Sequence, residues 1–424
     1  MNILVIGSGG REHALCWKLK QSTFTESIYC APGNGGTSQE AVNVELDVAQ
    51  HKKVTDFCKE KNIDLVVVGP EAPLALGMAD DLERAGIKVF GPSYAGARME
   101  SSKIFAKELM GRYNIPTAAF RIFEDFKQAE EYINSKGAPI VVKAYGLAAG
   151  KGVIIAETIE DAVKAAEDML VKNRFGSAGQ KIIVEEFLTG EEASILIITD
   201  GTNIIPLVTS QDHKRVYDGD KGPNTGGMGA YSPAPIVSEE LFDEVMEKIA
   251  RPTIDSLRNE GITYKGVLYI GLMITDAGVK VLEYNVRFGD PETQVVVPRL
   301  KSDLAELLMR AAEGDISGLE LEWDKKEYVC VVCASAGYPG DYDKGKLITG
   351  LDEARKLGAL VFHAGTQVED NGIVTFGGRV LNVVGCGEGI QQAIENTYKA
   401  VKQINFEGMH FRKDIGHRAV ANSR

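Results

Sequence analysis

The sequence predicts a multidomain α/β protein that begins with a doubly wound parallel sheet and ends in a smaller α+β domain. Three observations support this prediction. Over the first hundred residues, apolar strand-like runs alternate with helical patterns, which implies right-handed β-α-β crossovers. From about residue 101 the strands instead come in pairs around glycine turns, and the last hundred residues mix short strands and helices. The length of 424 residues also fits three domains of roughly 150 residues each.

The changes of pattern predict the domain boundaries. We expect an N-terminal α/β domain over residues 1–101, a middle domain over 102–325 and a C-terminal α+β domain over 326–424. A charged connector at 313–327 separates the last two.

The composition indicates which binding partners can be excluded and which cellular compartment to expect. With 47 basic and 60 acidic residues the formal net charge is −13, so we expect no binding to nucleic acid or to an anionic membrane surface. No apolar run approaches the roughly 18–20 residues of a membrane span, and the N-terminus lacks a secretory pattern. The six scattered cysteines fit a reducing compartment. We therefore expect a cytoplasmic protein, acting as a monomer on small molecules.

The C-x-x-C pair formed by Cys330 and Cys333 is interpreted as part of a buried strand. Residues three apart on a strand face opposite sides of the sheet, and no second pair completes a zinc site.

The carboxyl ends of the N-terminal strands predict a binding edge, where ligands of open α/β sheets lie. Each of these ends is followed by a loop of glycine, proline and small residues: Gly7–Arg11, Pro32–Gly36, Gly69–Leu74 and Gly91–Ser93.

The first of these loops does not match a dinucleotide fingerprint. Glu12 stands where that fingerprint needs glycine, and the second strand ends in Ala31-Pro32 without the ribose-binding acid. The loop still opens a helix, whose free N–H groups suit a phosphate or carboxylate, and Arg11 adds positive charge. Dinucleotide binding and a tight turn without a ligand remain as alternatives.

A second glycine loop, Gly146–Gly152, differs from a Walker loop. It is one residue short, has Gly152 in place of the magnesium-binding hydroxyl, and joins two strands instead of a strand and a helix. We expect a β-hairpin whose glycine loop, with Lys151 and the preceding Lys143, covers a triphosphate as a lid. A mobile surface turn is the alternative.

Two further features point to the same ligand. Lys103 lies in the first turn of a predicted helix, where the macrodipole disfavours a cation unless an anion binds nearby. A solvated surface lysine is the alternative. The strand end at Glu185-Glu186-Phe187-Leu188 supplies carboxylates for an adenine amino group or ribose hydroxyls, and a backbone that can bind the base edge.

A later strand predicts a metal site. Glu283, Asn285 and Arg287 alternate with Tyr284 and Val286, so the three polar residues share one face. A carboxylate beside an amide oxygen suits Mg²⁺, which takes few protein ligands and completes its shell with waters and phosphates. Arg287 is placed to hold a phosphate or an oxyanion.

The stretch from Gln211 to Pro233 is polar, glycine-rich and without periodicity, and is predicted to be a long functional loop. Asp212 and Lys214 precede glycines that can wrap an anion, and Lys214 or Arg215 can neutralise an acyl phosphate. His213 is interpreted as structural.

Taken in order, the motifs closely resemble those of the phosphoribosylamine–glycine ligase (glycinamide ribonucleotide synthetase) family of the ATP-grasp superfamily. The resemblance covers essentially the whole chain. The motifs are GSGGREHA (7–14), PGNGG (32–36), GPEAPL (69–74), SSKIFAKELM (101–110), GLAAGKGV (146–153), EEFLTGEEAS (185–194), QDHKRVYDGDKGPNTGGMGAYSP (211–233), EYNVRFGDPETQ (283–294) and GGRVLNVVG (377–385).

The resemblance implies an ATP-grasp fold, with a lid subdomain at about residues 120–190 and two lobes that close on ATP. It implies the second step of de novo purine synthesis, in which ATP phosphorylates glycine and 5-phosphoribosylamine attacks the glycyl phosphate. Mg²⁺ is the implied metal, with Mn²⁺ as an alternative.

The resemblance also assigns site residues. Those implied for ATP are Lys103, Lys143, Gly150, Lys151, Gly152, Glu185, Glu186, Phe187, Leu188 and Glu192. Those implied for substrate are Gly9, Gly10, Arg11, Asn34, Gly35, Pro70, Glu71, Asp212 and Gly227. Asp212, Lys214 and Arg287 are the implied catalytic group, and Glu283 and Asn285 the implied metal ligands.

One residue departs from the family pattern, because Tyr145 stands where the family usually has aspartate in Lys-Ala-Asp-Gly. Two other functions remain as alternatives: a ligase of the same superfamily with a different acid or amine, and a non-catalytic nucleotide sensor.

Overall fold

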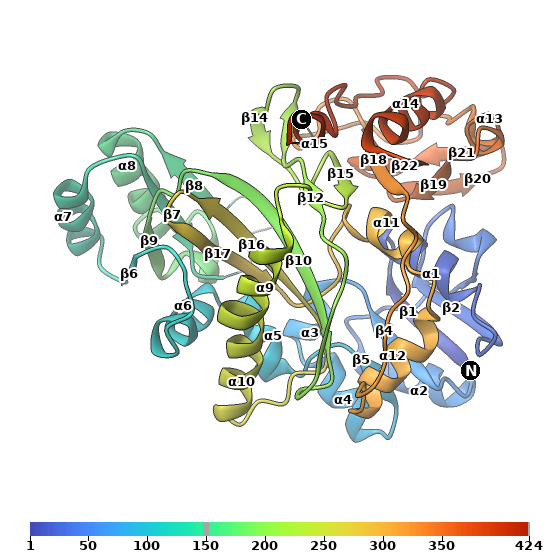
Figure 1. The fold of residues 1–424 in the computed structure, drawn as a ribbon, viewed down its shortest axis with the longest axis horizontal. Coiled ribbons are helices and arrows are strands. Elements are labelled where there is room, and N and C mark those ends of the chain that lie inside the picture. The colour runs from blue at the N-terminus through green and yellow to red at the C-terminus, as the bar shows by residue number, and fades with distance from the viewer. Residues whose placement is uncertain (147–151, 423–424) are drawn as a thin grey trace.

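The structure, a computed structural model, describes residues 1–146 and 152–422. Figure 1 shows the N-terminal and C-terminal sheets on one side of the molecule and a smaller sheet, covered by helices α7 and α8, on the other. The long strands β10, β16 and β17 lie between them (Figure 1).

The predicted N-terminal parallel sheet is confirmed, with the order β3-β2-β1-β4-β5. Alternate residues of β1 pack on opposite faces. Ile3 and Val5 pack in the same core as helices α1 and α12, whereas Leu4 and Ile6 pack in the core of α2 and α4. The elements are β1 (Asn2–Gly7), α1 (Gly10–Leu19), β2 (Ser27–Pro32), β3 (Val42–Asn43), α2 (His51–Glu60), β4 (Leu65–Val68), α3 (Glu71–Ala75), α4 (Met78–Arg84), β5 (Lys88–Phe90) and α12 (Leu304–Glu313).

The small sheet beyond helices α5 (Tyr94–Ser101) and α6 (Lys103–Arg112) has the order β6-β9-β7-β8. We call this sheet and its two helices the lid. The predicted hairpin is confirmed, since β7 and β8 pair antiparallel on either side of the glycine loop. The lid contains β6 (Phe120–Phe123), α7 (Phe126–Lys136), β7 (Ile140–Ala144), β8 (Val153–Ala156), α8 (Ile159–Leu170) and β9 (Ile182–Glu186).

The central sheet has the order β11-β10-β16-β17. Its strands alternate between two cores, so that Ile195 and Ile197 pack with helices α6, α9 and α10, while Leu196 and Ile198 pack on the other face. The elements are β10 (Glu191–Thr199), β11 (Ile204–Pro206), α9 (Glu239–Val245), a π-helical turn (Met246–Ala250), α10 (Arg251–Asn259), β16 (Gly266–Thr275) and β17 (Gly278–Asn285).

The prediction that Gln211–Pro233 is a loop is wrong, because the stretch holds four short strands. They are β12 (Gln211–Asp212), β13 (Arg215–Tyr217), β14 (Lys221–Asn224) and β15 (Gly229–Ser232). Strands β13 and β14 form a hairpin, while β12 and β15 join the C-terminal sheet in the order β12-β15-β18-β22-β19. Strands this short show no alternation, and β18, which pairs with β15, is about a hundred residues away in the chain.

The C-terminal sheet confirms the interpretation of the C-x-x-C pair. Cys330 and Cys333 both lie buried on β18, in two different cores. The remaining elements are α11 (Thr293–Val296), β18 (Glu327–Ala334), α13 (Leu351–Lys356), β19 (Leu360–His363), β20 (Thr366–Glu369), β21 (Gly372–Thr375), β22 (Arg379–Gly387), α14 (Ile390–Val401) and α15 (His417–Asn422). Among the described residues, every helix is too short or too polar to cross a bilayer.

Candidate active site

Helix α6 brings Lys103 to the start of the glycine loop. The helix begins at Lys103, and its N-cap Ser102 accepts a hydrogen bond from the N–H of Phe105 at 3.2 Å. The Lys103 ammonium donates to the carbonyl of Gly146 at 3.1 Å. Burial lowers the pKa of Lys103, against the opposing effect of Glu283. A buried cation at a helix N-terminus is unfavourable by itself, so an anionic ligand would stabilise it.

The lid strands carry a lysine and two carboxylates. Lys143 on β7 lies 3.0 Å from Oε2 of Glu185 on β9, and Lys107 on α6 lies 2.9 Å from the same oxygen. The Glu185 carboxylate, which the sequence assigned to adenine or ribose, is therefore an ion-pair partner of two lysines in this structure. Glu186 pairs with Lys280 of β17 at 2.6 Å.

Strand β17 presents the two predicted metal ligands on one face. Tyr284 and Val286 are buried in the core, so Glu283 and Asn285 point the other way, as the period-two pattern predicts. Burial favours the neutral carboxyl of Glu283, but Lys214 and three other basic side chains lower its pKa. Glu283 is therefore a carboxylate surrounded by cations.

This donor pair fits magnesium in its chemistry. A carboxylate and an amide oxygen are hard ligands, and Mg²⁺ usually takes one or two carboxylates together with phosphates and waters. The described residues contain no group of three or more histidine, cysteine or acidic side chains that could hold a metal alone. The Oδ1 atom of Asn285 accepts a hydrogen bond from Arg287 at 3.2 Å. We infer that Glu283 and Asn285 would share an ion with bound phosphates.

Lys214 lies between the carboxylates of Glu283 on β17 and Glu192 on β10. Its ammonium lies 2.7 Å from Oε2 of Glu192 and 3.9 Å from Oε1 of Glu283. Lys214 and Glu192 line a cavity of about 280 Å³ that Asp212 and Met273 also line. Burial raises the pKa of Asp212 to about 7, although Lys214 opposes that shift. Two of the predicted site residues, Asp212 and Lys214, therefore line the same cavity.

The raised pKa of Asp212 predicts a stability cost that depends on pH. An unfolded aspartate titrates near pH ~4, so the folded state holds an extra proton between about pH 4 and the folded value, and stability falls as pH rises through that window. We expect Asp212→Asn to unfold at a higher temperature than the wild type, with a larger gap at about pH 7.5 than at about pH 5.5. Thermal unfolding at both pH values tests this. A gap that does not change with pH would contradict it.

The same variant is expected to lose most glycine-dependent turnover. Asparagine keeps the size of Asp212 but cannot carry the negative charge on which its predicted role in substrate binding depends.

The side chain of Arg287 forms ion pairs with two glutamates of the N-terminal domain. Its guanidinium lies 3.3 Å from Glu100 and 3.6 Å from Glu71. The other Glu100 oxygen accepts the N–H of Val286 at 2.8 Å. Burial raises the pKa of Glu100 to about 6, against the lowering effect of Arg287. The predicted substrate residue Glu71 and the predicted catalytic residue Arg287 are thus brought together.

The expectation of free N–H groups at the start of α1 is wrong for Gly9 and Arg11. The Gly9 N–H donates to Glu12 at 2.5 Å, and the Arg11 N–H donates to Asp290 at 3.4 Å. The Arg11 guanidinium also turns to Glu12 and to the carbonyl of Phe288, at 2.5 and 3.1 Å. The protein's own carboxylates therefore fill the place proposed for an anion. The assignment of Gly9, Gly10 and Arg11 to substrate stays a prediction.

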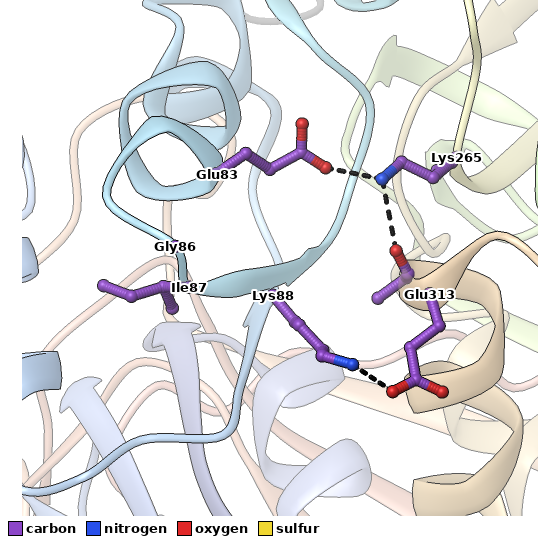
Figure 2. A pocket seen from close by; sticks show the side chains of 7 residues that line it. Glu83, Gly86, Ile87, Lys88, Lys265 and Glu313 are labelled. Carbon is purple, nitrogen blue, oxygen red and sulfur yellow. Dashed lines mark hydrogen bonds and ion pairs between the residues drawn. The ribbon is translucent and has the colours of Figure 1, made fainter.

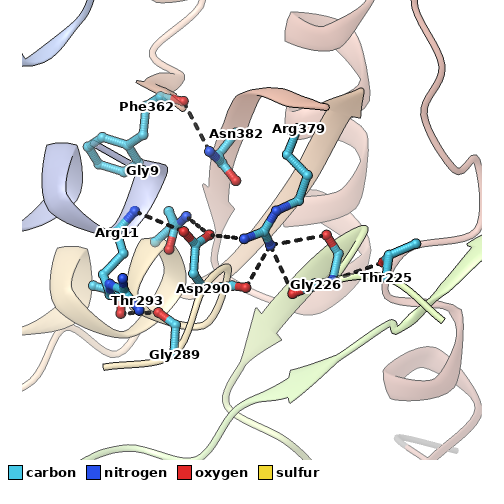
Figure 3. A network of polar contacts seen from close by, with 12 residues as sticks. Gly9, Arg11, Thr225, Gly226, Gly289, Asp290, Thr293, Phe362, Arg379 and Asn382 are labelled. Atoms are coloured by element: carbon cyan, nitrogen blue, oxygen red, sulfur yellow. Dashed lines mark hydrogen bonds and ion pairs between the residues drawn. The ribbon is translucent and has the colours of Figure 1, made fainter. Parts of the chain in front are cut away.

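A polar network joins this loop to the C-terminal domain (Figure 3). Arg379 of β22 lies 3.4 Å from the carboxylate of Asp290 and donates to the Asp290 carbonyl at 2.7 Å. The same guanidinium donates to the carbonyls of Gly226 and Gly227 at 2.9 and 3.4 Å. Four distant segments of the chain therefore meet around Asp290, and Gly227 is one of them.

The other predicted substrate residues in the N-terminal loops have mainly structural contacts here. The Asn34 amide donates to the carbonyl of His363 at 2.8 Å, and the Gly35 N–H donates to that of Thr366 at 3.2 Å. Both contacts attach the N-terminal domain to the C-terminal domain. Pro70 is the N-cap of α3.

The remaining predictions concern the glycine loop and the strand after β9. Gly150 and Lys151 lie outside the described residues. Gly152 is buried and its carbonyl accepts an N–H from the end of β7 at 2.8 Å. Phe187 is 38% exposed and Leu188 is half-buried, so both remain accessible at the edge of the lid.

A separate hollow of about 440 Å³ lies between the N-terminal sheet and α12. Figure 2 shows its charged side chains paired with one another. Lys265 lies 2.7 Å from Glu83, and Lys88 pairs with Glu313. Both lysines are therefore already neutralised, and the hollow does not resemble an anion site.

Sequence reasoning missed three residues near the site. Lys107 lies four residues after Lys103 on the same helix, and i,i+4 spacing is a signal that could have revealed it. Glu100 and Arg379 reach the site only through tertiary packing. They contact residues far away in the chain, at Arg287 and Asp290, so no local pattern identifies them.

The comparison with protein families covers most of the chain. Models described as phosphoribosylglycinamide synthetase match in three consecutive parts: the N domain at residues 1–100, the ATP-grasp (A) domain at 101–293 and the C domain at 328–418. The chain belongs to the phosphoribosylglycinamide synthetase family. Phosphoribosylamine–glycine ligase of Vibrio cholerae is a full-length relative of this family, 50% identical over 427 residues and covered completely in both chains.

Solved structures agree with this family assignment. A crystal structure of phosphoribosylamine–glycine ligase from Thermotoga maritima matches with a TM-score of 0.84 and 34% identity, over 98% of this chain and 100% of that one. The biotin carboxylase domain of a Hydrogenobacter thermophilus 2-oxoglutarate carboxylase matches with a TM-score of 0.75, over 97% of this chain and 91% of that one. At 15% identity the second match supports the ATP-grasp fold alone.

The departure at Tyr145 gives a testable prediction for this family member. The described contacts of Tyr145 at its backbone are retained by any residue: its N–H donates to Lys181 and its carbonyl accepts from the N–H of Lys103, both at 3.1 Å. We therefore expect Tyr145→Asp to have turnover equal to or higher than that of the wild type. Steady-state kinetics with saturating ATP measures it. A large fall in turnover would show that the glycine loop depends on the tyrosine.

Proposed function

We propose that the chain joins glycine to 5-phosphoribosylamine at the expense of ATP, giving glycinamide ribonucleotide, ADP and phosphate. This is the second step of de novo purine synthesis. The main observation in support is that Lys214 lies 3.9 Å from the carboxylate of Glu283 and Lys143 donates to the adjacent carbonyl of Leu282 at 3.4 Å. Together with Lys103, these lysines lower the pKa of Glu283. Three lysines next to a potential metal ligand suit a triphosphate, and full-length relatives carry the name of this ligase.

In the proposed reaction, a carboxylate oxygen of glycine attacks the γ-phosphorus of ATP, and ADP leaves. The amine of 5-phosphoribosylamine then attacks the carbonyl carbon of glycyl phosphate, loses a proton and expels phosphate. Phosphoryl transfer depends mainly on positioning and charge neutralisation, so no nucleophilic side chain is needed. Lys214 and Arg287 would neutralise the acyl phosphate, and Asp212 would hold the amino group of glycine.

Glu283 and Asn285 would hold a divalent ion, Mg²⁺ or alternatively Mn²⁺, which supplies charge neutralisation for the phosphates when bound. Lys103 and Lys143 would contact the phosphates from α6 and from the lid. Lid closure would keep water from the acyl phosphate.

The N-terminal loops would bind the phosphoribosyl group, because they converge with Arg287 and Asp290 at one edge of the parallel sheet. We further propose domain boundaries at 1–101, 102–325 and 326–424. The protein would act in the cytoplasm as a monomer.

An omission assay tests the proposed function. ADP release is followed with ATP, Mg²⁺, glycine and 5-phosphoribosylamine, and then with each component left out. We expect ADP only in the complete mixture, together with a product of the mass of glycinamide ribonucleotide. Equal ADP release without glycine would point to another acid substrate, and no turnover with any mixture would favour the nucleotide sensor.

A further inference from the structure

Three charged side chains form a buried cluster where the lid meets α6. Lys107 and Lys143 contact the same oxygen, Oε2 of Glu185, at 2.9 and 3.0 Å. The side chains of Lys107, Lys143 and Glu185 are only 4%, 10% and 2% exposed. Among the described residues, the other Glu185 oxygen, Oε1, is buried without a hydrogen-bond partner. The two ammonium groups therefore account for the neutralisation of this carboxylate.

The two lysines are held differently. Lys107 also donates to the hydroxyl of Thr117 at 2.8 Å, and that hydroxyl donates to the carbonyl of Val281 at 2.7 Å. Its ammonium further lies 5.6 Å from the ring centre of Phe120. Lys107 is thus fixed among α6, the segment entering the lid and β17.

Lys143 has a weaker second contact, which it makes with strand β17 beside the predicted metal ligand Glu283. Its ammonium donates to the carbonyl of Leu282, the neighbour of Glu283, at 3.4 Å. Lys143 is also the lysine that the proposed function assigns to the phosphates. Binding the phosphates would draw the Lys143 ammonium from Glu185, wholly or in part.

We propose that Lys107 is the permanent counter-ion of Glu185, which allows Lys143 to leave that carboxylate and bind the phosphates of ATP. Lys107 is then a positioning residue that acts on ATP through Glu185 and Lys143. The inference rests on the proposed function, because it requires that Lys143 bind ATP.

Lys143 can leave Glu185 only if another cation remains beside that carboxylate, because a buried charge without a partner is unfavourable. Removing one partner of a buried ion pair is strongly destabilising, because the other charge remains without compensation. With Lys107 in place, the departure of Lys143 leaves a Lys107–Glu185 pair. Without Lys107, it would leave Glu185 alone, and ATP would have to compete with the carboxylate for Lys143.

The electrostatics of the free protein agree with this arrangement. Burial raises the pKa of Glu185, but Lys143 and Lys107 outweigh it and hold the pKa below its usual value. Burial lowers the pKa of Lys107 to about 8, against the effect of Glu185. The cluster therefore brings two basic side chains to a single carboxylate oxygen, one more than a simple ion pair needs.

The test compares ATP binding by the full-length wild type and four variants, with titration calorimetry in the presence of Mg²⁺. Lys107→Met removes the counter-ion, and Lys107→Arg keeps the charge. Lys107→Met combined with Glu185→Gln removes both charges of the pair while leaving an amide oxygen as acceptor. Lys127→Met, on an exposed position of α7, is the matched control.

We expect Lys107→Met to raise the Kd for ATP by about 10–100-fold, which corresponds to about 1.4–2.8 kcal/mol. Lys107→Arg should bind within about fivefold of the wild type, the double variant should bind ATP more tightly than Lys107→Met, and Lys127→Met should not change the Kd. The same pattern is expected in the KM for ATP. Rescue by Glu185→Gln is the decisive result, because a packing defect at residue 107 would not be repaired by removing a charge at residue 185.

Two results would overturn the inference: an unchanged Kd in Lys107→Met, or a double variant that binds as weakly as Lys107→Met while its unfolding temperature matches that of the wild type. Either can occur while the wild type still binds ATP and releases ADP with glycine, so the proposed function would stand. Failure of the wild type to bind ATP would instead contradict the proposed function.

Discussion

Replacing Glu283 with alanine is expected to lower the turnover of the ligase reaction by at least about 100-fold, the effect of losing one preorganised charged group at a reacting centre. Glu283 is the only carboxylate of the proposed metal pair, and four basic side chains lower its pKa. Its loss would remove a metal ligand and leave those cations without their shared partner. The fold should persist, because Lys214 and Lys143 keep their pairs with Glu192 and Glu185.

The measurement is steady-state turnover at varied Mg²⁺, with thermal unfolding as the check on folding. Asp276→Ala is the matched control, since Asp276 lies exposed at the turn of the same β16–β17 hairpin. The control should keep wild-type turnover. Wild-type turnover in Glu283→Ala would remove the metal assignment.

Replacing Arg412 with alanine should have the largest effect on stability. The Arg412 side chain is 0% exposed and makes a two-bond ion pair with Asp414, with both distances 2.8 Å. It also contacts Asp220 at 2.9 Å and the carbonyl of Arg215 at 3.0 Å, so it attaches the C-terminal segment to the β13–β14 hairpin. Removing it leaves Asp414 without its two-bond partner and Asp220 with Arg418 alone, at an expected cost of about 3 kcal/mol.

Urea unfolding measures this free energy, and hydrogen exchange of the amides in residues 215–224 shows where stability is lost. Arg258→Ala is the control, because Arg258 is 49% exposed and pairs with Asp255 on the surface of α10. We expect the control to change the free energy of unfolding by less than about 0.5 kcal/mol. Equal stability of the two variants would contradict a structural role for the Arg412 pairs.

The sequence correctly predicted those parts of the fold that are determined by short, contiguous stretches of residues. The N-terminal sheet follows from apolar runs separated by helices, and the β7–β8 hairpin follows from two β-rich runs around a glycine loop. Strand β17 was predicted in the same way, because Tyr284 and Val286 must reach the core. In each case, one short window contains the pattern that determines the structure.

The errors arise where distant segments meet. Strand β15 within Gln211–Pro233 is ordered by pairing with β18, whose residues lie about a hundred positions later. At the start of α1, Asp290 occupies an N–H group that local reasoning left free. Glu12, which belongs to the same motif, accepts the N–H of Gly9. Comparison with a dinucleotide fingerprint showed only that glycine is missing at this position.

The proposed reaction is tested most directly by following an oxygen atom. Glycine labelled with ¹⁸O in its carboxylate is turned over with ATP, Mg²⁺ and 5-phosphoribosylamine, and the released phosphate is analysed by mass spectrometry. Attack of glycine on ATP, followed by attack of the amine on glycyl phosphate, transfers one labelled oxygen to each phosphate. We expect that label in the phosphate and its partner in glycinamide ribonucleotide. Unlabelled phosphate would contradict the glycyl phosphate route.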